Sequence, residues 1–130
     1  MSYPTWKVRK VKKTMRIVLP LPISLNSMYS QSRSGHRFKT QEAKDWEEEF
    51  MLKLLISRVK PLGKAKIEVF ISYYFKDNRS DLGNRTKILI DALQKSRFIE
   101  NDNQVWALHE YKEIDKKNPH CVLQVDKLEE

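Results

Sequence analysis

The chain has 130 residues, the size of one domain with its own core. No apolar run approaches about 20 residues, so we expect no membrane-spanning helix. The single cysteine, Cys121, excludes an intrachain disulfide and a cysteine-based zinc site. Residues 1–13 lack the apolar block of a signal peptide, and we therefore expect a cytoplasmic protein.

The net charge is +8, and much of the excess lies at the N-terminus. Residues 1–13 contain no acidic side chain and five cationic ones, which are Lys7, Arg9, Lys10, Lys12 and Lys13. We expect one domain over residues 1–130 with a basic arm at 1–13, and this charge favours a nucleic-acid partner. The alternative is a disordered tail that only adds solubility.

The first third of the chain predicts a strand, a loop and a helix. Alternating apolar residues predict a strand over 15–19, which Pro20 and Pro22 end. Turn-forming residues predict a loop over 23–39. Thr40 is a good helix cap, and the helix that it begins should continue towards Pro61. Its buried face should hold Ala43, Trp46, Phe50 and Leu54.

The middle of the chain switches to a period of two and then returns to helical spacing. Residues 66–75 predict a strand whose one apolar face consists of Ile67, Val69, Ile71, Tyr73 and Phe75. After a polar turn, a second helix is predicted over 82–96. Its buried face should consist of Leu82, Leu89, Ile90 and Leu93.

Two further strands are predicted to close the fold. Residues 105–111 and 121–125 alternate between apolar and polar side chains, and residues 112–120 have the composition of a hairpin loop. The order β-α-β-α-β-β predicts an α+β fold with one mixed sheet of about four strands and two helices packed on it.

Two polar stretches are candidates for chemistry. They are residues 80–87, at the start of the second helix, and residues 100–103, just after it. Asp81 and Asp102 are suited to bind Mg²⁺, which takes oxygen ligands and uses few carboxylates. Asn84, Lys87 and Asp91 are spaced to form one polar stripe, and Lys87 could stabilise negative charge on a reacting phosphate.

Each of these residues also has an ordinary structural interpretation. Ser80 or Asp81 could simply cap the second helix. Lys87 and Asp91 are spaced as an exposed i,i+4 ion pair. Asp102 lies in an Asn-rich stretch and is typical of a turn.

From about residue 16 to about residue 125 the chain resembles the RusA family of Holliday-junction resolvases. The segment LPLPISLNSMY at 19–29 is similar to that family's opening strand and loop. The central resemblance is carried by DLGN at 81–84, Lys87, DAL at 91–93 and FIENDNQV at 98–105.

This resemblance implies a homodimer that cuts four-way DNA junctions with Mg²⁺ or Mn²⁺. It implies metal ligands at Asp81 and Asp102, with Asp91 as a less certain one, and a catalytic lysine at Lys87. The family motif usually has an aspartate where this chain has Gly83, and a second acidic residue where it has Asn101.

We therefore predict a structure-selective endonuclease acting on branched DNA in recombination and repair. Asn84 and the cationic side chains should contact DNA, the latter being Lys7, Arg9, Lys10, Lys12, Arg79, Arg85 and Arg97. Ile88 and Ala92 lie off the main apolar face of the second helix and are predicted to meet the partner subunit. The alternatives are a non-catalytic junction- or duplex-binding module that has lost a carboxylate at Gly83, and a protein-interaction domain.

Overall fold

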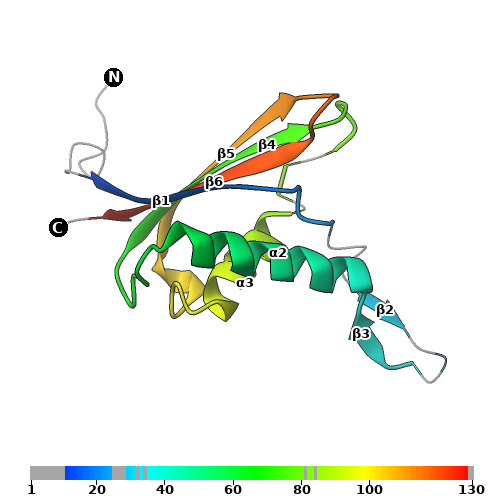
Figure 1. Cartoon of the computed structure of the whole chain (residues 1–130), viewed down its shortest axis with the longest axis horizontal. Helices are drawn as coiled ribbons and strands as arrows, with labels where there is room; N and C mark the ends of the chain where they lie inside the picture. Colours follow the sequence, from blue (N-terminus) through cyan, green and yellow to red (C-terminus); the bar gives the residue numbers. More distant parts are fainter. Residues whose placement is uncertain are drawn as a thin grey trace.

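The computed structural model describes residues 11–24, 29–31, 33, 35–80, 82–83 and 85–128 (Figure 1). Four strands form one sheet, in the order β1-β6-β4-β5. They are β1 (Val11–Leu19), β4 (Ile67–Phe75), β5 (Val105–Ile114) and β6 (His120–Leu128). The strand β4 is parallel to β5 and antiparallel to β6, which itself is antiparallel to β1. The predicted α+β fold with a mixed four-stranded sheet is confirmed.

The core lies between this sheet and two helices, which cover one of its faces (Figure 1). The predicted apolar face of β4 is confirmed, because all five of its side chains are buried. The strand β1 begins at Val11, so that residues 11–13, expected in the basic arm, belong to the sheet. Among the described helices, none is long and apolar enough to cross a membrane.

The predicted hairpin between the last two strands is wrong. The strands β5 and β6 lie on opposite sides of β4, and residues 115–119 pass across the end of that strand. The backbone N–H of Asp115 donates to the carbonyl of Phe75, the last residue of β4, at 2.8 Å. Alternation shows that a segment is a strand but not which strand it pairs with. The backbone N–H and C=O groups of a central strand need hydrogen-bond partners on both sides, and for β4 these partners are β5 and β6.

The helix α2 (Gln41–Ser57) begins where the sequence predicted. The hydroxyl of Thr40 accepts a hydrogen bond from the N–H of Ala43 at 3.2 Å, and Ala43, Trp46 and Phe50 are buried. The helix ends before Pro61, because Arg58 adopts a left-handed conformation with φ 56°.

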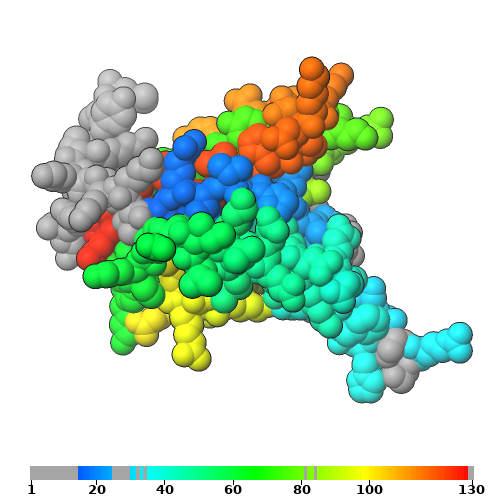
Figure 2. Space-filling model, in the orientation of Figure 1, coloured from blue at the N-terminus to red at the C-terminus, as the bar shows by residue number. Residues whose placement is uncertain are grey.

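The segment predicted as a loop contains a short hairpin of β2 (Tyr29–Gln31) and β3 (Arg37–Lys39). It extends from the body of the protein beside the start of α2 (Figures 1 and 2). The ammonium of Lys39 lies 2.6 Å from the carboxylate of Glu47 and so ties the hairpin to α2. Three-residue strands are too short to give a clear alternation of apolar and polar side chains, so the polar composition of this segment predicted a loop instead.

The helix α3 (Thr86–Lys95) lies beside α2 on the same face of the sheet (Figure 1). Leu89 and Leu93 are buried as predicted. The prediction that Ile88 and Ala92 face a partner subunit is wrong, since they are only 3% and 6% exposed. Both side chains are part of the chain's own core, because α3 is enclosed by the sheet above it and by α2 at its side.

Candidate active site at the two ends of helix α3

The helix α3 carries two of the predicted site residues. Lys87 is exposed in its first turn, and Asp91 is half-buried one turn later. The two side chains form no ion pair with each other. The exposed salt bridge that their i,i+4 spacing allows is therefore absent between them. Asn84, the third member of the predicted stripe, lies outside the described residues.

Asp102 lies beyond the C-terminal end of α3, in the short 3₁₀ helix η2 (Asp102–Gln104). A capping box begins this turn: the side chain of Asn101 accepts a hydrogen bond from the N–H of Asn103 at 2.9 Å. Asn101 therefore has a structural function where the family resemblance suggested an acidic residue. The carboxylate of Asp102 is exposed and has no hydrogen-bond partner in the described part of the chain, so it is free to bind a cation.

Gln104 fixes the segment that carries Asp102. Its side-chain oxygen accepts from the N–H groups of Glu100 and Asn101 at 2.7 and 2.8 Å. Its amide nitrogen donates to the carbonyls of Gly63 and Ala65 at 2.6 and 2.8 Å. The side chain is buried, and these four bonds join the segment to the residues that precede β4. Gln104 is thus a positioning residue for Asp102, and the spacing Asn-x-x-Gln was the motif that could have revealed it.

The N-terminal end of α3 differs from the prediction. The helix was expected from residue 82, but it begins at Thr86. Gly83 adopts φ +90°, which is incompatible with a helix and is a conformation that glycine reaches at little cost. Leu82, predicted in the buried face, is 41% exposed for the same reason. Asp81 lies outside the described residues, so its predicted function as a cap or a ligand stays a prediction.

Arg85 attaches this end of the helix to the rest of the fold. Its Nε donates to the carbonyl of Pro22 at 2.7 Å, and its guanidinium lies 5.3 Å from the centre of the Phe75 ring. Arg79 is fully exposed beside the carboxylate of Asp77. Arg79 and Lys87 are therefore available to a ligand at this end of α3, whereas part of the Arg85 side chain is already used in the fold.

A buried hydrogen-bond network lies directly behind the first turn of α3. The hydroxyl groups of Tyr73 and Thr86 are 2.6 Å apart, and Thr86 also donates to the carboxylate of Glu110 on β5. Burial raises the pKa of Tyr73, so its hydroxyl stays protonated. The sequence placed Tyr73 correctly in the core, but nothing in its alternation indicated that its hydroxyl would meet Thr86.

The candidate residues are thus divided between the two ends of one helix. Ten residues of α helix span about 15 Å. Lys87, Arg79 and the turn containing Gly83 lie at one end, and Asp102 and the exposed Arg97 follow the other. Within the described ranges, no group of three or more His, Cys, Asp or Glu side chains is placed to bind a metal ion.

Comparison with known proteins agrees with this reading of the sequence. A family model for the endodeoxyribonuclease RusA matches residues 20–126, which contain both ends of α3. The chain belongs to the RusA family. The crossover junction endodeoxyribonuclease RusA of Aquifex aeolicus (strain VF5) is 28% identical to it over 109 residues. That alignment covers 81% of this chain and 84% of the relative.

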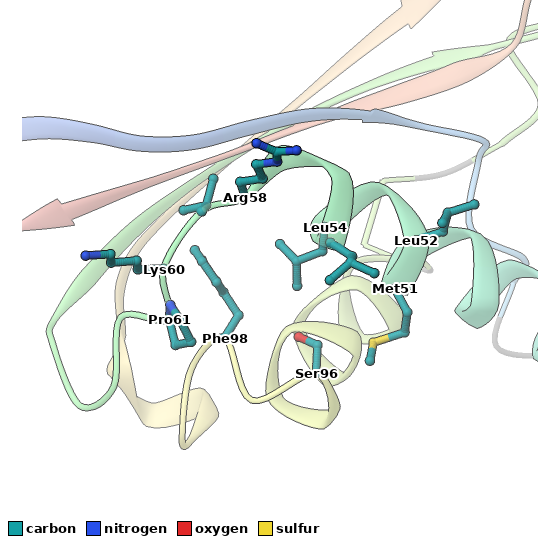
Figure 3. Close-up of a pocket in the computed structure, with 10 residues that line it drawn as sticks. Met51, Leu52, Leu54, Arg58, Lys60, Pro61, Ser96 and Phe98 are labelled. Carbon is teal, nitrogen blue, oxygen red and sulfur yellow. The ribbon is translucent and has the colours of Figure 1, made fainter.

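The candidate site residues do not line the apolar cleft that the described residues form. An apolar cleft of about 710 Å³ lies between the end of α2 and the turn after α3, and Figure 3 shows Met51, Leu54 and Phe98 lining it. Arg58 and Lys60 lie at its border, and no carboxylate is among its lining residues. Its chemistry does not suit metal-assisted cleavage of a phosphodiester, for which oxygen ligands are required.

Proposed function

We propose that this chain is an endonuclease that cuts four-way DNA junctions. The observation that carries the proposal is the match to the RusA family over residues 20–126. The relative from Aquifex aeolicus is named as a crossover junction endodeoxyribonuclease, and its alignment with this chain covers most of both proteins.

We assign Asp81 and Asp102 as ligands of Mg²⁺ or Mn²⁺, and Asp91 as a less certain third. The carboxylate of Asp102 is exposed and has no partner among the described residues, which supports this assignment because Mg²⁺ prefers such oxygen ligands. A bound ion would supply an activated water and hold the leaving oxygen. Lys87, exposed in the first turn of α3, would stabilise negative charge that develops on the phosphate.

The separation of these residues along α3 supports a homodimer. If two copies place their α3 helices antiparallel, Asp102 of one copy lies at the end where the other copy carries residues 81–87. Each dimer would then contain two composite sites, one for each of the two opposed strands that must be cut. The twofold symmetry of a dimer also matches that of a four-way junction.

DNA binding would rest on phosphate contacts, which position a protein without reading the base sequence. Arg79 and Arg97 are exposed and fit this function directly. Arg85 contributes less, because its Nε is bonded to Pro22. Lys7, Arg9, Lys10 and Asn84 lie outside the described residues, and Lys12 belongs to β1.

One observation favours a second candidate, a junction-binding module without catalysis. Gly83 stands where the family usually has an aspartate, and it has no side chain to offer a metal ion. A family member of this kind would retain its shape and cationic surface while its chemistry was lost.

A single assay separates the two functions. The purified chain is incubated with a synthetic four-way junction or a linear duplex of the same arm sequence, in Mg²⁺ or in a chelator. Paired nicks on the junction in Mg²⁺, with the duplex left intact, are expected of the nuclease. A junction that is bound but uncut in Mg²⁺ would establish the binding module instead.

A further inference from the structure

The β2–β3 hairpin projects from the body of the protein beside the start of α2 (Figures 1 and 2), and contacts on both sides of it join it to the two helices. Ahead of the hairpin, the carbonyl of Pro22 accepts a hydrogen bond from Arg85, the residue before α3. At the end of the hairpin, Lys39 is paired with Glu47 on α2. The projection is therefore attached to the end of α3 that carries Lys87.

The hairpin is positively charged and contains no acidic residue. Its cations, within residues 29–39, are Arg33, Arg37 and Lys39. The charge of Lys39 is balanced by Glu47, whereas Arg33 is exposed in the turn. A projecting segment of this charge is complementary to the phosphates of nucleic acid, and contacts with phosphates do not depend on the base sequence.

One large apolar side chain lies exposed on this polar hairpin. Phe38 is 50% exposed, although phenylalanine is among the residues most often buried. Successive side chains of a strand point to opposite faces, and Lys39 points towards α2, so Phe38 points away from that helix. Its partner across the hairpin is Ser30, whose side chain is too small to cover the ring. Phe38 is thus available to a ligand on the face of the hairpin that is turned away from α2.

We propose that Phe38 stacks on a base at the branch point of a four-way junction, while cations of the hairpin bind the phosphates beside it. An aromatic ring gains little from a charged phosphate but stacks well on the flat face of a base. In a continuous duplex every base is already stacked on both faces, so an inserted apolar side chain must first unstack a step. At a branch point the stacking of the arms is interrupted, and the ring enters at a lower cost.

This contact makes the hairpin a source of selectivity for DNA structure. Phosphate contacts strengthen binding to a junction and to a duplex alike. A stacking contact that only the junction offers adds affinity for the junction alone. The inference rests on the proposed function, action on four-way junctions, and it names Phe38 as a residue that selects them.

Binding affinities measured in a chelator, where no strand is cut, test this inference. The wild-type chain and its variants are titrated with a four-way junction and with a linear duplex of the same arm sequence. We expect Phe38→Ala to weaken junction binding about tenfold, the contribution of one aromatic–base stack, and to change duplex binding by no more than about twofold. Phe38→Trp should keep the wild-type affinity for the junction, because the indole ring also stacks on bases.

Two control variants separate stacking from other effects. Tyr111→Ala removes an aromatic ring that is equally 50% exposed, but on β5, and should leave both affinities unchanged. Arg33→Ala removes a cation from the turn of the hairpin and should weaken binding to both DNA forms by a similar factor. The same loss should follow when Arg33→Ala is added to Phe38→Ala, which shows that the hairpin still contacts DNA when it lacks the ring.

The fluorescence of 2-aminopurine reports on the base itself. This base analogue fluoresces weakly while it is stacked between other bases. When it is placed at the branch point, binding of the wild-type chain should change its fluorescence, and binding of Phe38→Ala should not. The same analogue placed well inside an arm should respond to neither protein.

The outcomes separate this inference from the proposed function. A loss confined to the junction in Phe38→Ala, with the affinity kept in Phe38→Trp, supports the stacking contact. An equal loss on both DNA forms, no loss on either, or a Phe38→Trp chain as weak as Phe38→Ala overturns it, and a wild type that cuts the junction then leaves the proposed function standing. A wild-type chain that does not prefer the junction to the duplex overturns both.

Discussion

The two ends of helix α3 are built in different ways, although both carry residues of the candidate site. The C-terminal end is followed by a capping box and by Gln104, whose side chain makes four hydrogen bonds to backbone groups. At the N-terminal end the side chain of Arg85, the residue before the helix, does not cap it, and among the described residues Arg85 and Thr86 hold this end through contacts with distant parts of the chain. Asp102 is thus positioned by one buried side chain that bonds both to its own segment and to residues 63–65, whereas the described residues at the start of α3 are held through the side chains of Arg85 and Thr86.

The bonds around Asp102 bear on how a metal-dependent nuclease orders its ligands. A ligand that is fixed before the metal binds reduces the ordering that binding must later impose. We infer that the Asp102 end supplies the rigid half of each composite site.

The largest expected effect is on catalysis at either end. Asp81→Asn and Asp102→Asn should each lower junction cleavage by roughly 100-fold or more, because a lost metal ligand removes several kcal/mol of charge stabilisation. Junction binding should be retained or improved, since Asn keeps the shape and removes a negative charge near DNA. Cleavage rates and band shifts on the same junction measure the two effects. Cleavage by both variants at the wild-type rate would contradict the assignment.

The next largest effect is on stability at the C-terminal end. Gln104→Ala should lower the free energy of unfolding by about 2–4 kcal/mol, because two N–H groups and two carbonyls lose their partners. Denaturant unfolding measures this loss. Asn103→Ala is a suitable control, because Asn103 is exposed in the same turn and its side chain is not part of the Gln104 network. Equal stability of the two variants would show that the network does not hold this end.

A smaller loss is expected at the N-terminal end. Thr86→Val keeps the shape of the side chain but deprives the Tyr73 hydroxyl and the Glu110 carboxylate of their partner. We expect a loss of about 1–3 kcal/mol in the free energy of unfolding. A loss larger than that of Gln104→Ala would reverse the comparison between the two ends.

The smallest effect concerns Gly83. Gly83→Asp and Gly83→Asn both place a side chain at φ +90°, where open space surrounds the added Cβ, so each should cost about 1–2 kcal/mol of stability. If a carboxylate is what this site lacks, only Gly83→Asp should gain thermal stability in Mg²⁺ and cut at lower Mg²⁺ concentration. Equal responses of the two variants to Mg²⁺ would show that the site is built around glycine.

The sequence predicted those parts of the fold that depend on periodicity. The alternation in β4 and the spacing of Ala43, Trp46 and Phe50 each determine a buried face, and both were confirmed. The position of β6 beside β4, and the burial of Ile88 and Ala92, depend on how the elements pack and were not contained in any local pattern.

The family was predictable from the sequence, but the geometry around the candidate residues was not. The motif around Asp81 and Asp102 identified the family, and the family match confirmed that identification. The start of α3 was predicted too early, because Gly83 was treated as a helical residue rather than as one with positive φ. Gln104 was missed because its importance lies in contacts with Gly63 and Ala65, about forty residues earlier in the chain.

The central claim is that each cleavage site combines Asp81 of one copy with Asp102 of the other. The most direct test mixes the Asp81→Asn and Asp102→Asn chains and lets them form mixed dimers by refolding or subunit exchange. The mixture is then assayed on a four-way junction in Mg²⁺. A mixed dimer has one composite site with both aspartates intact and one with neither. We therefore predict that the mixture nicks the junction although each variant alone does not. A mixture as inactive as its two components, formed from a wild type that cuts, would contradict the claim and place both aspartates in one chain.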